Sequence, residues 1–111
     1  MRKNKYGAKK SWFDGYKFDS QAERARYIHL KYELKISPVE VHPKFVIQPG
    51  FTYKGHRIRQ ITYSADFKYT EPDGTIVVED VKGGRITQTP LWRVKWKMAK
   101  YQNPSLDFRV V

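Results

Sequence analysis

The sequence has no cysteine and no long apolar run. The missing cysteines exclude disulfide bonds and thiolate metal sites, which fits a reducing compartment. No apolar segment approaches the roughly 18 residues of a membrane-spanning helix, and residues 1–10 lack the apolar core of a signal peptide. The three histidines lie too far apart along the chain to predict a zinc cluster. We therefore expect a cytoplasmic protein with no membrane partner.

Acidic residues are also scarce. The 111-residue chain has 11 Asp and Glu against 22 Lys and Arg, a formal net charge of +11. No acid occurs between Val81 and Leu106. Segregated positive charge of this kind suits the phosphate backbone of a nucleic acid. A polyanionic partner, and DNA in particular, is the first hypothesis, and a basic tail that only aids solubility is the competing interpretation of residues 1–10.

The length of the chain allows one compact domain. We expect a flexible basic arm over residues 1–10 and a single domain of mixed α and β structure over residues 11–111. Asp14 and Gly15 predict a short hairpin, and Ser20 with Glu23 has the spacing of a helix capping box. The patterns that follow predict a helix over 21–35, strands over 44–53 (interrupted at 49–50), 57–69 and 75–82, a helix over 90–102, and a closing strand over 106–111.

The two predicted helices differ in their apolar patterns. The first carries apolar residues on two nearly opposite sides, so we expect it to be packed on both. Glu23 falls on one of these stripes, one turn before Tyr27, which directs its carboxylate into the protein. The apolar stripe of the second helix consists of Leu91, Val94, Met98 and Tyr101.

The segment EPDGT, residues 71–75, has the composition of a tight turn. A three-residue loop in this hairpin pairs Glu71 with Thr75. The same register places Asp66 opposite Asp80, at the far end of the two strands. The sequence therefore predicts two carboxylates directly across from each other.

Two opposed carboxylates roughly 5 Å apart repel by on the order of 3 kcal/mol at an effective dielectric constant near 20. A purely structural strand has little reason to keep that pair, whereas Mg²⁺ is commonly held by carboxylates, water and phosphate oxygens. Lys82, two residues after Asp80, lies on the same face, opposite Ser64 and beside such a metal. The alternatives are a strand end with surface ion pairs, and a four-residue loop that pairs Asp66 with Glu79.

Together these residues resemble the PD-(D/E)xK nuclease superfamily, whose motif is an acid on one strand and acid-x-Lys on the next, often with a glutamate on the first helix. The order of helix, three strands, helix and strand also matches, over about residues 11–111. More narrowly, the chain is similar to a family of small phage-encoded proteins placed in that superfamily, akin to Holliday-junction resolvases. The matching residues are Glu23 in SQAERARY, Asp66 in YSADF, and Asp80 and Lys82 in EDVKG.

The resemblance implies a restriction-endonuclease-like core, in which helices flank a mixed central sheet. It implies that Asp66, Asp80 and the Val81 carbonyl hold Mg²⁺ or Mn²⁺. Lys82 would position the attacking water. Glu23 would complete the metal site or hold a metal-bound water, and its competing role is the helix cap.

Two positions stand apart from this motif. The strand alternation puts Glu79 on the other face from Asp80, which indicates a structural or secondary role. Ala65 stands where the superfamily usually has a proline before its first acid.

The remaining basic residues fit DNA binding around the site. The two glycines that follow Lys82 would let a phosphate approach the backbone closely. Trp92 and Trp96, one turn apart, are interpreted as core or dimer contacts rather than as base-stacking platforms. The candidate DNA-binding residues are Lys9, Lys10, Gly83, Gly84, Arg85, Arg93, Lys97 and Lys100.

The sequence therefore predicts a metal-dependent DNA endonuclease that hydrolyses phosphodiester bonds. A domain this small has little surface for reading a long sequence. This favours structure-selective cutting of Holliday junctions or other branches by a symmetric homodimer, with nicking of plain duplex as a close variant. The competing hypotheses are a non-catalytic basic nucleic-acid-binding module and an accessory nuclease-fold protein in phage DNA replication or packaging.

Overall fold

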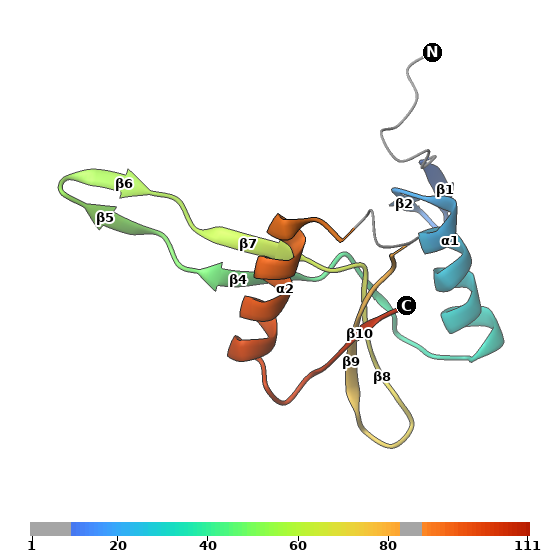
Figure 1. The fold of residues 1–111 in the computed structure, drawn as a ribbon. Helices are drawn as coiled ribbons and strands as arrows, with labels where there is room; N and C mark the ends of the chain where they lie inside the picture. The colour runs from blue at the N-terminus through green and yellow to red at the C-terminus, as the bar shows by residue number, and fades with distance from the viewer. Residues whose placement is uncertain (1–9, 83–87) are drawn as a thin grey trace, which may run out of the picture.

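The computed structural model describes residues 10–82 and 88–111 (Figure 1). Nearly all of the arm predicted over residues 1–10 lies outside these ranges, as do the candidate DNA-binding residues Lys9, Gly83, Gly84 and Arg85. The architecture is mixed α and β with two helices, as the sequence predicted, and the described strands form several small sheets. None of the helices within the described ranges is long and apolar enough to cross a membrane.

A four-stranded mixed sheet forms the centre of the molecule. Its strands are β3 (Glu40–Val41), β8 (Phe67–Thr70), β9 (Ile76–Asp80) and β10 (Asp107–Val110), in the order β10-β9-β8-β3. The β8–β9 and β3–β8 pairs are antiparallel, whereas β10 runs parallel to β9. The connection between β9 and β10 carries a helix, which is the usual way to join parallel neighbours.

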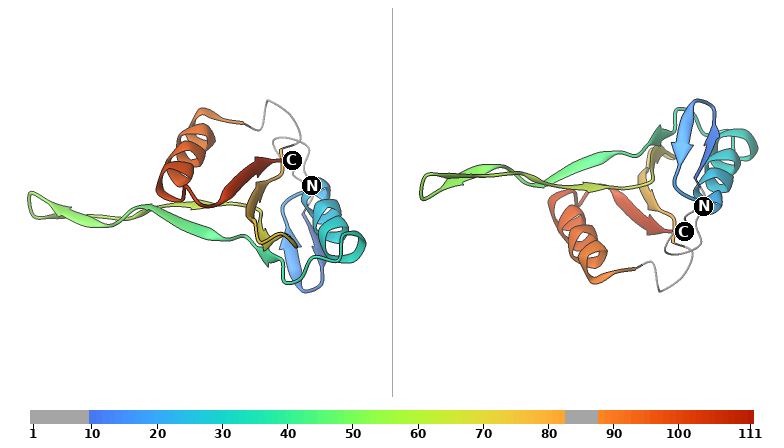
Figure 2. Two further views of the ribbon diagram at one scale, coloured as in Figure 1. Left: turned by 90° about the horizontal axis from the view of Figure 1, so that it is seen from below. Right: turned by 90° about the horizontal axis from the view of Figure 1, so that it is seen from above.

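Helices cover both faces of this sheet (Figures 1 and 2). Helix α1 (Gln21–Ile28) continues as a π-helical turn, His29–Glu33, and helix α2 is Pro90–Gln102. Both predicted caps are present, because Ser20 Oγ and Thr89 Oγ1 each accept a backbone N–H from three residues further on, at 3.1 Å. The sequence therefore marked the start of both helices correctly.

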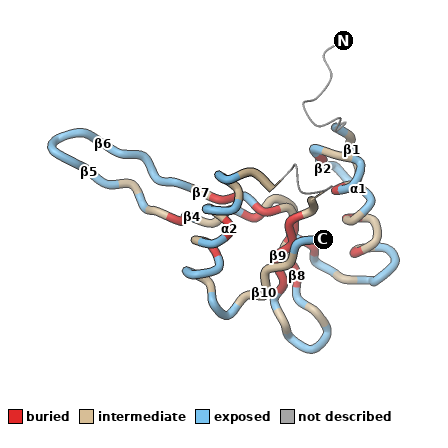
Figure 3. The backbone as a smooth tube through the Cα atoms, viewed as in Figure 1, coloured by how far each residue is buried: buried red, intermediate tan, exposed pale blue. Residues whose placement is uncertain are grey.

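Alternation along β9 divides the core into two clusters. Val77 packs with Tyr27 and Leu30 of the first helical segment, whereas its neighbour Val78 packs with Trp96 and Ala99 of α2. Successive strand residues point to opposite faces, so one short strand anchors both helices. Figure 3 shows the buried backbone running along β8 and β9, between the two helices.

A long two-stranded arm projects from this body (Figures 1 and 2). It is built from β4 (Lys44–Gln48) paired with β7 (Ile61–Ser64), and from β5 (Phe51–Tyr53) paired with β6 (His56–Ile58) at the tip. We call residues 44–64 the hairpin arm. The radius of gyration of 15.8 Å exceeds the ~13 Å of a compact chain of this size, as such a projection requires.

Two tight turns follow one rule. The hairpin of β1 (Ser11–Phe13) and β2 (Tyr16–Phe18) turns at Asp14 and Gly15, with φ of 52° and 80°. Lys54 and Gly55 at the tip of the hairpin arm have φ of 49° and 80°. Two successive positive φ values make the type I′ turn, whose twist matches paired strands. The hairpin predicted at residues 14–15 is confirmed.

The strand predicted over residues 57–69 is divided between β6, β7 and β8. The chain bends between β7 and β8 because Ala65 packs into the α2 cluster, whereas Phe67 packs into the α1 cluster. Strand β7 therefore pairs with β4, and Ser64 lies opposite Lys44. The prediction that Ser64 faces Lys82 is wrong.

The predicted helix faces are also wrong in part. On α1 only Glu23 and Tyr27 are buried, while the alanine side of the helix is exposed. On α2 the buried residues are Trp96 and Ala99, and Tyr101 is 86% exposed. A tryptophan buries more apolar surface than the smaller residues it displaced, which decides the orientation of α2. Trp96 is thus a core residue, as interpreted from the sequence.

Candidate active site

The candidate acids Asp66 and Asp80 lie at the same end of the β8–β9 pair, in the predicted register. Phe67 lies opposite Glu79, and the Glu71 N–H donates to the Thr75 carbonyl at 2.8 Å, which closes the three-residue loop. The ladder ends at Asp66, whose N–H donates to the Glu79 carbonyl at 3.0 Å. The main chain of Asp66 therefore lies beside the end of β9, next to Asp80.

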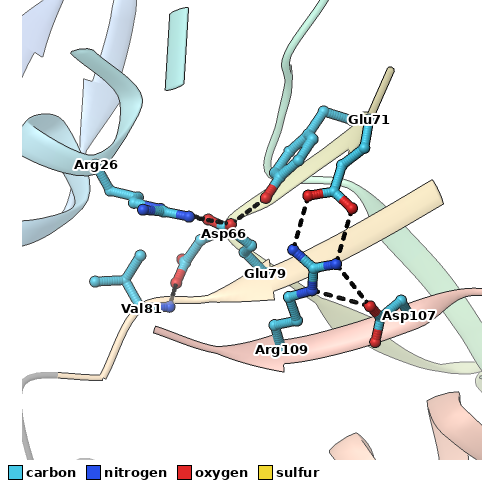
Figure 4. Close-up of polar contacts among 8 residues, drawn as sticks. Arg26, Asp66, Glu71, Glu79, Val81, Asp107 and Arg109 are labelled. Atoms are coloured by element: carbon cyan, nitrogen blue, oxygen red, sulfur yellow. Dashed lines mark hydrogen bonds and ion pairs between the residues drawn. The ribbon is translucent and has the colours of Figure 1, made fainter. Parts of the chain in front are cut away.

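Asp66 is held by the backbone of the motif itself. The Val81 N–H donates to Asp66 Oδ2 at 2.6 Å, as Figure 4 shows. The Asp66 and Glu23 carboxyl groups lie close enough for each to affect the pKa of the other. Burial, the Asp80 charge and the Glu23 charge together raise the pKa of Asp66 to about 8.

Asp80 is buried, with 4% of its surface exposed. Its Oδ2 accepts hydrogen bonds from the Tyr63 hydroxyl and from Trp92 Nε1, the latter at 3.0 Å. Its Oδ1 lies 3.0 Å from Lys82 Nζ, which also lies 4.6 Å from the centre of the Trp92 ring. Burial and, to a smaller extent, the hydrogen bond to the Asp80 carboxylate raise the pKa of Tyr63. Tyr63 and Trp92 are site residues that the sequence did not reveal.

Glu23 reaches this site from α1. It is 7% exposed, and burial is the main cause of its raised pKa. Both Asp66 and Asp80 contribute to its electrostatic environment. The Ser20 cap accepts the backbone N–H of Glu23 at 3.1 Å and also contacts the Glu23 carboxylate, with Ser20 Oγ 3.5 Å from Oε2. The structure thus brings together all four residues of the predicted constellation, namely Glu23, Asp66, Asp80 and Lys82.

Glu79 has different partners. Its carboxylate is fully buried and accepts two hydrogen bonds from Arg26, at 2.8 and 2.5 Å, and one from the Tyr69 hydroxyl (Figure 4). The Glu79 carboxylate raises the pKa of Arg26. Arg26 lies one turn after Glu23 on α1, so this ion pair fixes the helix that carries Glu23. Glu79 therefore has the structural role that its side of the strand indicated.

A second ion pair stabilises the edge of the sheet that β10 forms. Arg109 of β10 forms two hydrogen bonds with Glu71, at 3.0 and 2.9 Å, and also contacts Asp107 (Figure 4). It joins the β8–β9 turn to β10. The backbone of β10 in turn supports the motif, because the Lys82 N–H donates to the Val111 carbonyl and the Val111 N–H donates to the Asp80 carbonyl, both at 3.0 Å.

Comparison with protein families identifies the family of the chain. Residues 3–110 match the family described as "Protein of unknown function (DUF1064)". The chain belongs to this family. No curated protein and no solved structure matches the chain. The DUF1064 match spans every residue of the site, and the description of this family names no function.

Among the described residues of this DUF1064 protein, one group of possible metal ligands includes a histidine. Within residues 10–82 and 88–111, the Asp, Glu or His ligand atoms that all lie within 4.8 Å of one another belong to Asp19, Glu23 and His42. The sequence separated the histidines and gave no reason to join one to Glu23. His42 reaches the site because β3 pairs with β8, and the His42 N–H donates to the Asp66 carbonyl at 2.9 Å.

The candidate DNA-binding residues that the structure describes are exposed. Lys10 precedes β1, and Arg93, Lys97 and Lys100 lie on α2. Because Trp92 of the same helix contacts Asp80, α2 extends from the acidic site along one side of the molecule. A phosphate backbone bound along α2 would pass beside that site.

The acids predict a pH dependence of stability in this DUF1064 protein. Asp66 and Glu23 both have raised pKa values in the metal-free fold, so between about pH 4 and pH 8 the folded chain binds more protons than the unfolded chain. The free energy of unfolding therefore falls as the pH rises through this window. In EDTA, we expect a loss on the order of 2 kcal/mol from pH 5 to pH 9, measured by urea unfolding.

The matched variant is Asp66→Asn, which keeps an oxygen to accept the Val81 N–H and removes the charge. We expect this variant to be more stable than the wild type at pH 9 and to have a flatter pH profile. A profile as steep as that of the wild type would contradict the assignment of the raised pKa to Asp66.

Proposed function

We propose that this protein is a metal-dependent endodeoxyribonuclease that hydrolyses phosphodiester bonds, and that its α+β fold is restriction-endonuclease-like. One observation supports the proposal above the others. The carboxylates of Glu23, Asp66 and Asp80 lie close enough to affect one another electrostatically, Lys82 Nζ lies 3.0 Å from Asp80 Oδ1, and burial and mutual repulsion raise the pKa of Asp66. A divalent cation, Mg²⁺ or Mn²⁺, offsets the repulsion that a purely structural site would carry as a cost.

The hydrogen bonds of Asp80 suggest how the cation is held. Neutral donors from Tyr63 and Trp92 fix its Oδ2, which leaves Oδ1 for a cation once Lys82 has moved away from it. Asp66, fixed by the Val81 N–H, supplies the second carboxylate. The Val81 carbonyl remains the predicted third ligand.

Lys82 supplies the positive charge next to the cation. Its side chain is 15% exposed and packs over Trp92, so its ammonium group would stay beside the site after a cation displaces it from Asp80 Oδ1. There it orients the attacking water and stabilises the negative charge that develops on the phosphate. A cation held there would lower the pKa of a bound water and polarise the phosphate, and Glu23 would complete its site or hold a bound water.

The hairpin arm gives DNA a second basic surface. Residues 44–64 contain four Lys and Arg and no Asp or Glu, and residues 51–60 are all exposed. An exposed strand pair without acidic residues can follow a phosphate backbone with no repulsive partner. The sequence did not single out this arm, because its charges become one surface only when β4 and β7 pair.

Removing the charge of the arm should weaken DNA binding. The test is the triple variant Lys54→Gln, Arg57→Gln and Arg59→Gln. We expect the slope of log affinity against log salt concentration to become less steep by up to about 2.7, the value for three lost phosphate contacts. Fluorescence anisotropy with duplex and four-way-junction DNA in EDTA measures it. The double variant Lys17→Gln and Lys35→Gln, on the body of the protein, is the charge control. An unchanged slope in the triple variant would exclude the arm from the DNA interface.

A homodimer is part of the proposal, because cutting both strands of a branch requires two active sites. The stripe of Leu91, Val94 and Tyr101 on α2 is exposed, at 65%, 55% and 86%, and is an apolar surface that a second copy would cover. Sedimentation equilibrium of the wild type and of Tyr101→Lys tests this contact.

The function itself is tested with labelled four-way junction, flap and linear duplex DNA, each incubated with the purified protein in Mg²⁺, Mn²⁺ or EDTA. We expect metal-dependent cleavage, with the junction or the flap cut faster than the duplex. DNA binding without cleavage of any substrate in either metal would favour the non-catalytic binding module or the accessory protein. Equal cutting of all three substrates would keep the nuclease and reject the structure selectivity.

A further inference from the structure

Asp19, Glu23 and His42 come from three separate segments of the chain and meet on the α1 side of the site. Asp19 follows β2, Glu23 lies in the first turn of α1, and His42 follows β3. Their possible ligand atoms all lie within 4.8 Å of one another. Asp19 is exposed and Glu23 is buried, so the group opens to solvent on one side only.

Two buried atoms of this group lack a hydrogen-bond partner. They are Glu23 Oε1 and His42 Nε2, which lie 3.6 Å apart. That separation exceeds the length of an N–H···O hydrogen bond, although it lies within the range of an ion pair if the imidazole is protonated. A buried polar atom without a partner costs about 1–3 kcal/mol, so two such atoms facing each other require an explanation. A cation between them would give each atom a partner.

The backbone of His42 gives a third, independent indication. His42 has a φ of +56°, a left-handed conformation that is uncommon for residues other than glycine. Its N–H is bound to the Asp66 carbonyl, so this conformation is held by the acidic site itself. Conformations of this kind persist where the surrounding structure enforces them, and they cluster at ligand-binding sites.

We propose that Asp19, Glu23 and His42 form a second divalent-cation site, distinct from the site of Asp66 and Asp80 and adjacent to it through Glu23. Three protein ligands leave coordination positions for water or a phosphate oxygen, as in catalytic rather than closed structural sites. The imidazole nitrogen selects for Mn²⁺ and other transition-metal ions over Mg²⁺, which prefers oxygen ligands alone. The site therefore takes Mn²⁺ in preference to Mg²⁺.

Glu23 connects this proposal with the nuclease function. Its carboxyl group lies close enough to that of Asp66 to affect its pKa, and its Oε1 lies 3.6 Å from His42 Nε2. Two cations on either side of Glu23 could hold the two sides of one phosphodiester. The existence of the second site does not depend on the proposed function, because cation binding is measured without DNA.

The experiment is a titration of the full chain with Mn²⁺ or Mg²⁺ by isothermal calorimetry, in the absence of DNA. The test variant is His42→Asn, because asparagine tolerates the left-handed backbone and lacks the imidazole nitrogen. We expect its Mn²⁺ affinity at the His42 site to fall at least about tenfold and its Mg²⁺ affinity to change less than about twofold. His56→Ala, on the exposed hairpin arm, is the histidine control and should bind Mn²⁺ as the wild type does.

Proton NMR of the histidine rings provides the second readout. Mn²⁺ at substoichiometric amounts should broaden the His42 resonance before that of His56. Asp80→Asn, which removes a ligand of the other site, should keep this broadening, since Asp80 contributes no ligand to the His42 site. Wild-type Mn²⁺ affinity in His42→Asn, or broadening of both histidines together, would overturn the proposal. Cleavage of DNA with no Mn²⁺ binding at His42 would reject this site alone, and Mn²⁺ binding without cleavage would reject the nuclease alone.

Discussion

Replacing Asp80 with asparagine is expected to lower the rate of Mg²⁺-dependent DNA cleavage at least about 1,000-fold. The asparagine would keep an oxygen to accept the Tyr63 and Trp92 hydrogen bonds, so the fold around β9 should survive. What the variant loses is the negative charge that holds the cation. Lys82→Ala should reduce the rate by about 100-fold or more, since it removes the group that orients water and stabilises developing charge.

Binding measurements separate chemistry from folding in these variants. Affinity for DNA in EDTA should stay within about threefold of the wild type for Asp80→Asn, because the basic surfaces of α2 and the hairpin arm are unchanged. The matched control is Asp73→Asn, a conservative change at an exposed acid in the β8–β9 turn, which should cut at the wild-type rate. Cleavage by Asp80→Asn within tenfold of the wild type would remove Asp80 from the active site.

Arg26→Ala is expected to destabilise the protein by about 3–5 kcal/mol. The variant leaves the Glu79 carboxylate fully buried with only the Tyr69 hydroxyl as a partner. It also releases α1 from β9, so Glu23 loses the anchor that brings it to Asp66. Chemical unfolding measures the loss, and Arg93→Ala, on an exposed face of α2, should change the free energy of unfolding by less than about 0.5 kcal/mol.

A double variant tests the cause of that loss. In Arg26→Met with Glu79→Gln, the buried charge is absent and the new glutamine side chain still accepts the Tyr69 hydroxyl. Most of the stability lost in Arg26→Ala should return, because the cost of a broken buried ion pair lies in the charge left behind. A double variant as unstable as Arg26→Ala would show that packing of the arginine side chain, and not the unpaired Glu79, causes the loss.

Local rules predicted the part of the site that lies on neighbouring strands. Turn chemistry at residues 71–75 set the register of β8 and β9, and this register placed Asp66 next to Asp80 and Glu79 on the other face. Side-chain capping by Ser20 and Thr89 marked the first residues of both helices. These features depend on residues a few positions apart, so the sequence contains the information directly.

Contacts between distant segments escaped this reasoning. His42 joins the site only because a two-residue strand pairs with β8, and two residues give no periodicity to detect. The bend after Ala65 does not interrupt the apolar alternation of the sequence, since Tyr63, Ala65 and Phe67 are all buried, although Phe67 belongs to the other cluster. Trp92 and Trp96 decide which face of α2 is buried. Their partners, Asp80 and Phe108, lie on β9 and β10.

The most direct test of the account is the single-turnover cleavage rate of a labelled four-way junction, measured against Mg²⁺ concentration. Wild-type protein and Asp66→Asn are purified in parallel, so that a contaminating nuclease affects both equally. We predict a rate that rises to saturation with Mg²⁺ in the wild type, vanishes in EDTA, and is lower by at least about 1,000-fold in Asp66→Asn. Equal rates in the two proteins, or no cleavage by the wild type at any concentration of Mg²⁺ or Mn²⁺, would contradict a hydrolytic metal site at Asp66 and Asp80.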